Sequence, residues 1–214
     1  MQIYQQEFIK LAIQCNALKF GTFKLKSGRI SPYFFNAGCF NTGNMLAKLG
    51  QCYAETINGS AIKFDMLFGP AYKGIPLVTS TAIALANQFR KNVPYAFNRK
   101  EAKDHGEGGT IVGAELNGKV LIIDDVITAG TAIRDAIALI ENAGAKPAGI
   151  VITLDRQEHG RDHMSAIQEI EENFGLQVIS IIKLEQLIEY VKHQQELQEN
   201  LHRMLEYQQE YGTT

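Results

Sequence analysis

Two adjacent carboxylates followed by small and hydroxyl residues stand out in this sequence of 214 residues. Asp124 and Asp125 come directly after the apolar run 120–123, and Thr128-Ala-Gly-Thr131 precedes a segment with helical spacing. A helix N-terminus offers backbone N–H groups that bind phosphate, and the threonine hydroxyls add further donors. Neighbouring carboxylates do not suit phosphate itself, but they suit ribose hydroxyls or a divalent cation that the phosphate shares. The stretch therefore predicts a sugar-phosphate site.

Other phosphate-binding patterns are missing from the sequence. No Gly-Lys pair is followed by Ser or Thr, as a Walker A loop requires, and no Gly-x-Gly-x-x-Gly follows an apolar run. An ordinary capped helix after a strand would explain Thr128 or Thr131, but it would not explain two acids in a row. These comparisons favour a sugar phosphate over a nucleotide.

The elements around this turn are those of an α/β protein. The run 120–123 has the short, β-branched character of a parallel strand covered on both faces, and 131–145 has helical spacing. A second strand, 64–68, runs into Gly69-Pro-Ala-Tyr-Lys-Gly-Ile-Pro76 and a helix that continues to Asn87. Since ligands bind at the carboxyl ends of parallel strands, both turns should share one edge of the sheet. There, Gly69 and Gly74 permit close approach of a ligand, and Lys73 supplies a positive charge that suits a diphosphate.

A charged segment follows a third predicted strand, 94–97. The stretch 98–110 combines glycines with cationic side chains, those of Arg99, Lys100, Lys103 and His105, and it has little to bury. Long unstructured loops in compact domains are often lids, so this segment could close over a diphosphate and exclude water. A plain solvated run of charges is the alternative. The chain should return as a strand at 111–115.

Residues 20–36 alternate in hydrophobicity and turn at Ser27-Gly28, which predicts a hairpin outside the main sheet. Its cations, Lys24, Lys26 and Arg29, are ordinary solvated charges unless an anion site lies beneath them. Phe34 and Phe35 are expected in the core, but neighbours in a strand face opposite sides, so one ring could border a flat ligand.

Arg156 follows the predicted buried strand 147–154 and also reaches the carboxyl edge. Its guanidinium could bind a carboxylate as a fork, or it could form an ion pair with Asp155 or Glu158. Helices are expected at 4–17, 44–57, 165–173 and 185–207, with a strand at 178–182. The last helix is rich in glutamine, and its apolar stripe of Leu187, Val191, Leu201 and Leu205 indicates packing, possibly at a subunit contact.

Composition limits the classes of function. The formal net charge is −2 and the pI is about 6.2, so no basic surface indicates binding to nucleic acid or to an anionic membrane. Cys15, Cys39 and Cys52 are odd in number and lack metal-ligand spacing, which suggests reduced thiols in the cytoplasm. The start of the sequence lacks the pattern of a signal peptide, and no apolar run could span a bilayer. We expect one large domain, 1–214.

Taken together, several blocks resemble the bacterial-type orotate phosphoribosyltransferases, a branch of the type I phosphoribosyltransferase family. They are Phe23-Lys-Leu-Lys-Ser-Gly-Arg29, Ser31-Pro-Tyr-Phe-Phe-Asn36, the block 68–76, Asn98-Arg-Lys-Glu-Ala-Lys-Asp-His-Gly-Glu-Gly108, the acidic turn and Leu154-Asp-Arg-Gln157. The resemblance implies an α/β fold with a central, mostly parallel sheet flanked by helices. It also implies an N-terminal hood with the hairpin (about 1–40), a flexible catalytic loop (98–110) and a turn at 124–132 that binds phosphoribosyl diphosphate (PRPP).

By the same resemblance, the protein transfers ribose 5-phosphate from PRPP to orotate, with Mg²⁺ held mainly through the diphosphate and water. The implied PRPP-binding residues are Lys26, Tyr72, Lys73, Arg99, Lys100, Lys103, His105, Asp124, Asp125, Val126, Ile127, Thr128, Ala129, Gly130, Thr131 and Ala132. Lys103, Lys26, Asp124 and Asp125 are the implied catalytic residues. The implied orotate-binding residues are Phe34, Phe35, Thr128 and Arg156. In this family the catalytic loop reaches the neighbouring subunit's site, so a homodimer is expected.

Two other functions remain open at this point. A phosphoribosyltransferase acting on purine bases would share the acidic turn, although the hairpin with Lys26 and the edge Arg156 favour an acidic pyrimidine. A regulator that only senses PRPP would also keep the turn, but such a regulator is expected to carry a DNA-binding module, and it would have no use for the Lys103 loop. Turnover of PRPP with orotate separates all three.

Overall fold

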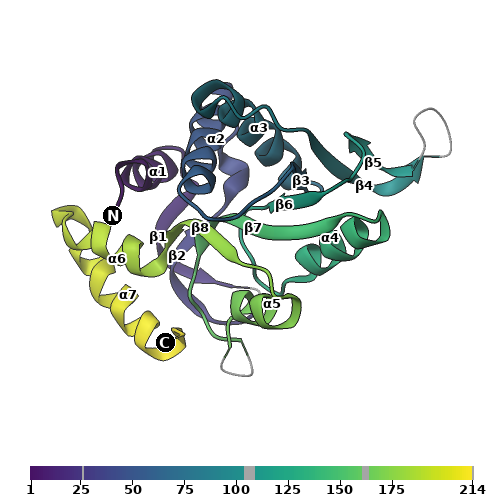
Figure 1. Ribbon diagram of the computed structural model, residues 1–214. Coiled ribbons are helices and arrows are strands. Elements are labelled where there is room, and N and C mark those ends of the chain that lie inside the picture. Colours follow the sequence, from purple (N-terminus) through teal and green to yellow (C-terminus); the bar gives the residue numbers. More distant parts are fainter. Residues whose placement is uncertain (26, 104–108, 161–163, 214) are drawn as a thin grey trace.

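The computed structural model describes residues 1–25, 27–103, 109–160 and 164–213. A six-stranded sheet runs through the centre of the molecule, with helices on both of its faces (Figure 1). Its strands are β3 (Met66–Gly69), β4 (Tyr95–Lys103), β5 (Gly109–Gly113), β6 (Lys119–Ile123), β7 (Lys146–Asp155) and β8 (Val178–Lys183), in the order β5-β4-β3-β6-β7-β8. Only β5 pairs antiparallel, with β4, and the other pairs are parallel. The mostly parallel α/β fold that the sequence predicts is confirmed.

Alternate residues of the strands serve two separate cores. In β6, Leu121 and Ile123 face the core formed with α1 (Ile3–Gln14), α2 (Gly43–Asn58), α3 (Gly74–Phe89) and α6 (Leu184–Lys192). Val120 and Ile122 face the opposite core, formed with α4 (Thr131–Asn142) and α5 (Ala166–Phe174). Because both faces are covered, the strand is apolar at nearly every position, as expected for a parallel sheet.

The N-terminal hairpin lies outside this sheet, as predicted. β1 (Leu18–Lys24) and β2 (Ile30–Phe35) form their own two-stranded sheet, with a bulge between Phe20 and Phe23, and the 3₁₀ turn η1 (Ala37–Cys39) leads on to α2. Gly21 lies in the bulge with φ +155°. Phe8 of α1 packs against Phe35, which fixes the hairpin to the body of the molecule.

The single helix predicted for 185–207 is wrong. The chain forms α6, a 3₁₀ turn η2 (Gln195–Leu197) and a separate α7 (Gln198–Tyr211). Leu187 and Val191 are buried as expected, but Leu205 is 40% exposed, and Met204 and Tyr207 are buried in its place. The stretch 192–200 is polar apart from Leu197, so nothing holds a continuous helix against the body there. Among the described residues, no helix could cross a membrane.

The third strand extends beyond its predicted end. β4 ends at Lys103 rather than at residue 97, because 98–103 continues as an extended arm on which 109–113 folds back as β5. The periodicity of the apolar residues could not reveal this arm, since its cross-strand hydrogen bonds need no buried side chain. The other predicted elements agree with the structure to within a few residues.

Candidate active site

The backbone carbonyls of the acidic turn accept hydrogen bonds from α2 and β7. Tyr53 of α2 donates its hydroxyl hydrogen bond to the carbonyl of Asp124 at 2.7 Å, and the amide of Thr153 on β7 donates to the carbonyl of Asp125 at 2.8 Å. The hydroxyl of Thr153 donates to the same carbonyl of Asp125. These satisfied carbonyls fix the backbone of the turn, and the Asp124 side chain contributes as well, because its Oδ1 atom accepts from the Asp125 amide. No sequence pattern marks Tyr53 and Thr153 as site residues, because only the folded sheet brings them to the turn.

The two carboxylates have different electrostatic environments. Burial, reinforced by the neighbouring charge of Asp125, raises the pKa of Asp124 to about 7. Asp125 instead pairs with Lys73 of the second turn, with 2.6 Å between Nζ and Oδ2. The lysine side chain is 54% exposed, so its charge also faces solvent at the sheet edge. The structure thereby brings together two turns that are about fifty residues apart in sequence.

The small-residue turn surrounds a cavity of about 120 Å³. Asp124 and residues 126–133 line it, at the N-terminus of α4. Gly130 adopts a left-handed φ of +70°, and a Cβ there would lie 3.0 Å from the guanidinium of Arg134. Arg134 donates to the carbonyl of Ala129 at 2.6 Å, which stabilises the turn. With Thr128 and Thr131 exposed, the cavity offers backbone and hydroxyl donors to a phosphate-sized anion.

The second turn, 70–73, is closed by two glycines. A Cβ on Gly74 would lie 2.7 Å from the Gly69 carbonyl carbon, so neither position accepts a side chain. The amide of Ala71 donates to Oδ1 of Asn98, the first residue after the predicted end of β4, at 2.8 Å. Tyr72 is 65% exposed, and the ammonium of Lys100 lies 5.0 Å from the centre of its ring. Asn98 is therefore a further site residue, and no local pattern in the sequence marks it.

Arg156 lies between the main sheet and the hairpin. Its Nη2 atom donates to the hydroxyl of Ser31 at 3.0 Å, and its guanidinium carbon lies 4.3 Å from the ring centre of Tyr33. It also pairs with Glu158, so the ion pair that the sequence left open exists. Phe34 is 39% exposed beside Phe23, whereas Phe35 is turned into the core. Only Phe34 could therefore present its ring to a ligand.

Several predicted residues cannot be compared in full. Lys26 and His105 lie outside the described residues, and for Lys103 only the backbone, at the end of β4, is described. Arg99 lies on β4, and its Nη1 atom is buried with no hydrogen-bond partner among the described residues. Their predicted roles stay predictions.

Comparison with known proteins agrees with this geometry. The family model of the phosphoribosyl transferase domain matches residues 40–179. Orotate phosphoribosyltransferase of Pseudomonas paraeruginosa is 58% identical over 99% of this chain and 100% of that protein, and that of Salmonella newport is 57% identical over the same shares. The chain belongs to the orotate phosphoribosyltransferase family. A crystal structure of the Francisella tularensis member superposes on this phosphoribosyltransferase with a TM-score of 0.87 and 46% identity, over 96% of this chain and 99% of that one.

More distant structures share the fold of this phosphoribosyltransferase. A Mycobacterium tuberculosis orotate phosphoribosyltransferase in complex with PRPP matches with a TM-score of 0.64 and 20% identity, over 86% of this chain and 98% of that one. The central sheet and its flanking helices are therefore common to proteins whose sequences have diverged widely.

Proposed function

We propose that this protein transfers the 5-phosphoribosyl group from PRPP to orotate, giving orotidine 5′-monophosphate and diphosphate in pyrimidine biosynthesis. One observation carries the proposal. The sugar-phosphate turn after β6 and the cation Arg156 after β7 end neighbouring strands, and Thr153 of β7 bonds directly to the acidic turn. A phosphoribosyl group and a small anionic base would thus meet at one edge of the sheet.

The chemistry accounts for the residue types. As the C1–O bond of PRPP breaks, positive charge develops on the ribose ring and negative charge on the departing diphosphate. The ammonium of Lys73 and the amides of Tyr72 and Lys73 would stabilise the diphosphate, and Asp124 and Asp125 would hold the ribose hydroxyls. The N-terminus of α4 would hold the 5-phosphate. No nucleophilic side chain is needed, because the ring nitrogen of orotate attacks C1 itself and its N–H proton passes to the departing diphosphate or to water.

We further propose that Mg²⁺ accompanies PRPP and is held mainly by the diphosphate and by water. The site fits an ion of this kind, because Mg²⁺ favours oxygen ligands and is commonly bound through substrate phosphates. Asp125 is already paired with Lys73, which leaves little free carboxylate for a metal cage built by the protein alone. When bound, the ion would neutralise charge on the leaving group.

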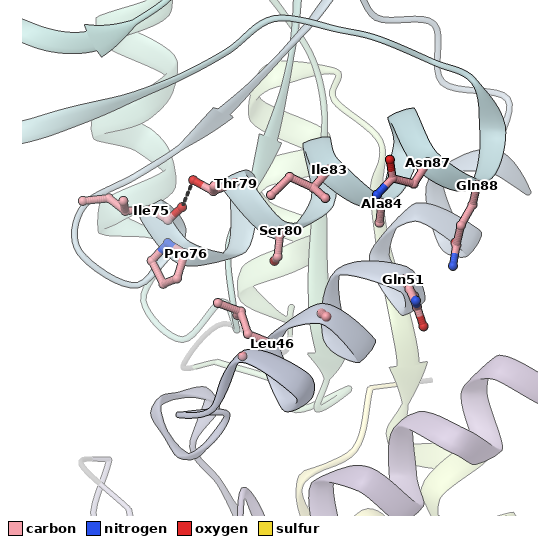
Figure 2. Close-up of a pocket in the computed structure, with 12 residues that line it drawn as sticks. Leu46, Gln51, Ile75, Pro76, Thr79, Ser80, Ile83, Ala84, Asn87 and Gln88 are labelled. Atoms are coloured by element: carbon pink, nitrogen blue, oxygen red, sulfur yellow. Dashed lines mark hydrogen bonds between the residues drawn. The ribbon is translucent and has the colours of Figure 1, made fainter.

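A homodimer with a shared catalytic loop is also part of the proposal. A groove of about 390 Å³ lies between α2 and α3, and none of its twelve lining residues is charged (Figure 2). It begins at Ile75 and Pro76, next to the diphosphate turn, and Ile83 on its rim is 57% exposed. An exposed apolar surface supports contact with a second copy. In this dimer, the 98–110 segment of one chain would act at the diphosphate turn of the other.

The cytoplasm is the proposed compartment. The thiols of Cys15, Cys39 and Cys52 are free, and reduced cysteines are typical of cytosolic proteins.

An assay of PRPP turnover with a panel of bases tests the activity. We expect loss of orotate absorbance with PRPP and Mg²⁺, and little turnover of adenine, guanine, hypoxanthine or uracil. Preference for a purine would support the alternative enzyme, and PRPP binding without turnover of any base would support the regulator.

A further inference from the structure

The guanidinium of Arg156 is held by Glu158, two residues further along the chain, and by residues of β2. Its Nε and Nη2 atoms lie 2.8 and 2.6 Å from the same oxygen, Oε1 of Glu158, and each of these two side chains is 13% exposed. Nη2 also donates to Ser31 of β2, and Tyr33 of β2 lies under the guanidinium plane. Charge-assisted bonds of this kind are stronger than neutral ones. The side chain is therefore fixed before any ligand arrives.

The hydrogen bonds leave one edge of Arg156 available. A guanidinium carries five N–H donors, one on Nε and two on each Nη. Glu158 and Ser31 take up the Nε–Nη2 edge, so neither of them uses the two N–H groups of Nη1, and the hydroxyl of Tyr207 also lies close to this guanidinium. An anion that binds Arg156 in this arrangement would meet Nη1, so Glu158 determines which edge the ligand contacts.

A second cation offsets the charge of Glu158. A lone carboxylate beside an anion-binding arginine would weaken the attraction for an anion. Arg29, from the turn of the hairpin, places Nη1 3.8 Å from Oε2 of Glu158, and its Nη2 donates to the carbonyl of His159 at 2.8 Å. The three side chains together carry one net positive charge. Glu158 can thus orient Arg156 without cancelling the charge that attracts an anion.

The end of α7 secures this cluster. The amide of His159 donates to the carbonyl of Tyr211 at 2.9 Å, and the amide of Thr213 donates to the carbonyl of Gln157 at 2.8 Å. Tyr211 also lies 4.6 Å beneath Arg29, and the ring of Tyr207 meets that of Tyr33 edge-on at 6.4 Å. The loop after β7 is therefore closed by the C-terminal helix, whose buried face is formed by Met204 and Tyr207.

We propose that Glu158 is a positioning residue for the acceptor base: together with Arg29 and the end of α7, it holds Arg156 so that the Nη1 edge meets the orotate carboxylate. This inference rests on the proposed role of Arg156 in binding orotate. It gives the glutamine-rich C-terminal helix a function in the site, as the support of the loop that carries Arg156.

Kinetics of Glu158→Ala and Glu158→Gln test the proposal, with Glu206→Ala as the matched control. Glu206 lies on α7 and forms an ion pair with His202, but its side chain is 64% exposed and lies outside the Arg156 cluster. Glu158→Ala should raise the KM for orotate about tenfold, while kcat and the KM for PRPP change less than about twofold. Glu158→Gln keeps an oxygen that accepts from Arg156, so it should raise the orotate KM only about threefold. The control should match the parent protein.

Measuring Arg156→Ala alone and combined with Glu158→Ala separates the positioning role of Glu158 from the proposed binding of orotate by Arg156. If Arg156→Ala leaves the orotate KM unchanged, the proposed role of Arg156 is wrong. If it raises the KM but Glu158→Ala leaves it unchanged or lowers it, Glu158 does not position Arg156. When Glu158 acts through Arg156, the second substitution should add almost nothing to the first. Thermal unfolding identifies a variant that fails to fold, and in that case Glu158→Gln alone decides.

Discussion

The two halves of the active site are built in different ways. The half proposed for PRPP consists of two turns, 70–73 and 124–131, whose shapes are set by glycines and by backbone hydrogen bonds. The half proposed for orotate is assembled from side chains of the hairpin, the loop after β7 and α7, and Arg29 and Tyr211, which are in contact there, lie 182 residues apart in sequence (211 − 29). Each turn thus depends on a few groups that bind its backbone, such as Tyr53 and Asn98, whereas the orotate half depends on side chains from all three of its segments.

The largest effect on kcat is expected for substitutions in the catalytic loop and in the acidic turn, and mixed dimers of the two variants test whether the loop acts across the subunit interface. Lys103→Ala and Asp125→Asn should each reduce kcat by about 10²-fold or more, because one removes a cation for the leaving group and the other a partner of the ribose and of Lys73. If the catalytic loop acts in trans, mixing the two variants under subunit exchange should restore activity. Random pairing makes about half of the dimers hybrids with one intact site, so recovery should reach about a quarter of the parent activity.

Subunit exchange itself must be demonstrated in that experiment, for instance with differently tagged chains and mass spectrometry. Exchange without recovered activity would place the loop in cis. A nearly normal kcat for Lys103→Ala would instead show that this lysine does not serve the departing diphosphate.

Arg156→Ala should act on the base half alone. Removing the cation should raise the KM for orotate by about 10- to 100-fold, as expected for loss of a charge-assisted pair, and should leave PRPP binding nearly unchanged. Initial rates with each substrate varied in turn, together with calorimetric titration of PRPP, measure both effects. An equal loss of PRPP affinity would mean that the two halves are not independent.

The sequence predicts the local parts of the site but not the contacts that only the fold creates. The acidic turn, its helix and the glycines of the diphosphate turn are local patterns, so their positions and types could be read directly. Tyr53, Thr153 and Asn98 could not, because each acts on a backbone group that is brought near only by the fold. The break between α6 and α7 differs, because it does have a signal in the sequence: residues 192–200 are polar apart from Leu197 and interrupt the apolar stripe.

Asn98→Ala should have a smaller effect, confined to the PRPP half. The substitution leaves the amide of Ala71 without its acceptor and loosens the diphosphate turn, so the KM for PRPP should rise about five- to tenfold while that for orotate stays constant. Asn58→Ala is a suitable control, because Asn58 accepts a hydrogen bond from Lys91 at an exposed place outside the site. A change in the orotate KM alone would contradict the proposed support of the diphosphate turn.

The smallest effect concerns stability rather than catalysis, and it tests the cost of burying the Asp124 carboxylate. Burial raises the pKa of Asp124 from 3.8 to about 7. The ionised carboxylate therefore costs the folded state free energy: the cost is absent at low pH, grows as pH rises from about 4 to 7, and is complete above that range.

Asp124→Asn removes this charge, and its amide oxygen can still accept from the Asp125 amide, which donates to Oδ1 at 2.9 Å in the parent protein. Without substrate or Mg²⁺, the variant should be more stable than the parent at pH 8 by at least about 1 kcal/mol, or about 2–4 °C in Tm. The difference should shrink as pH falls towards 5. Thermal unfolding across this range measures it, and an equal Tm for the two proteins at pH 8 would show that the folded protein solvates the Asp124 carboxylate well despite its burial.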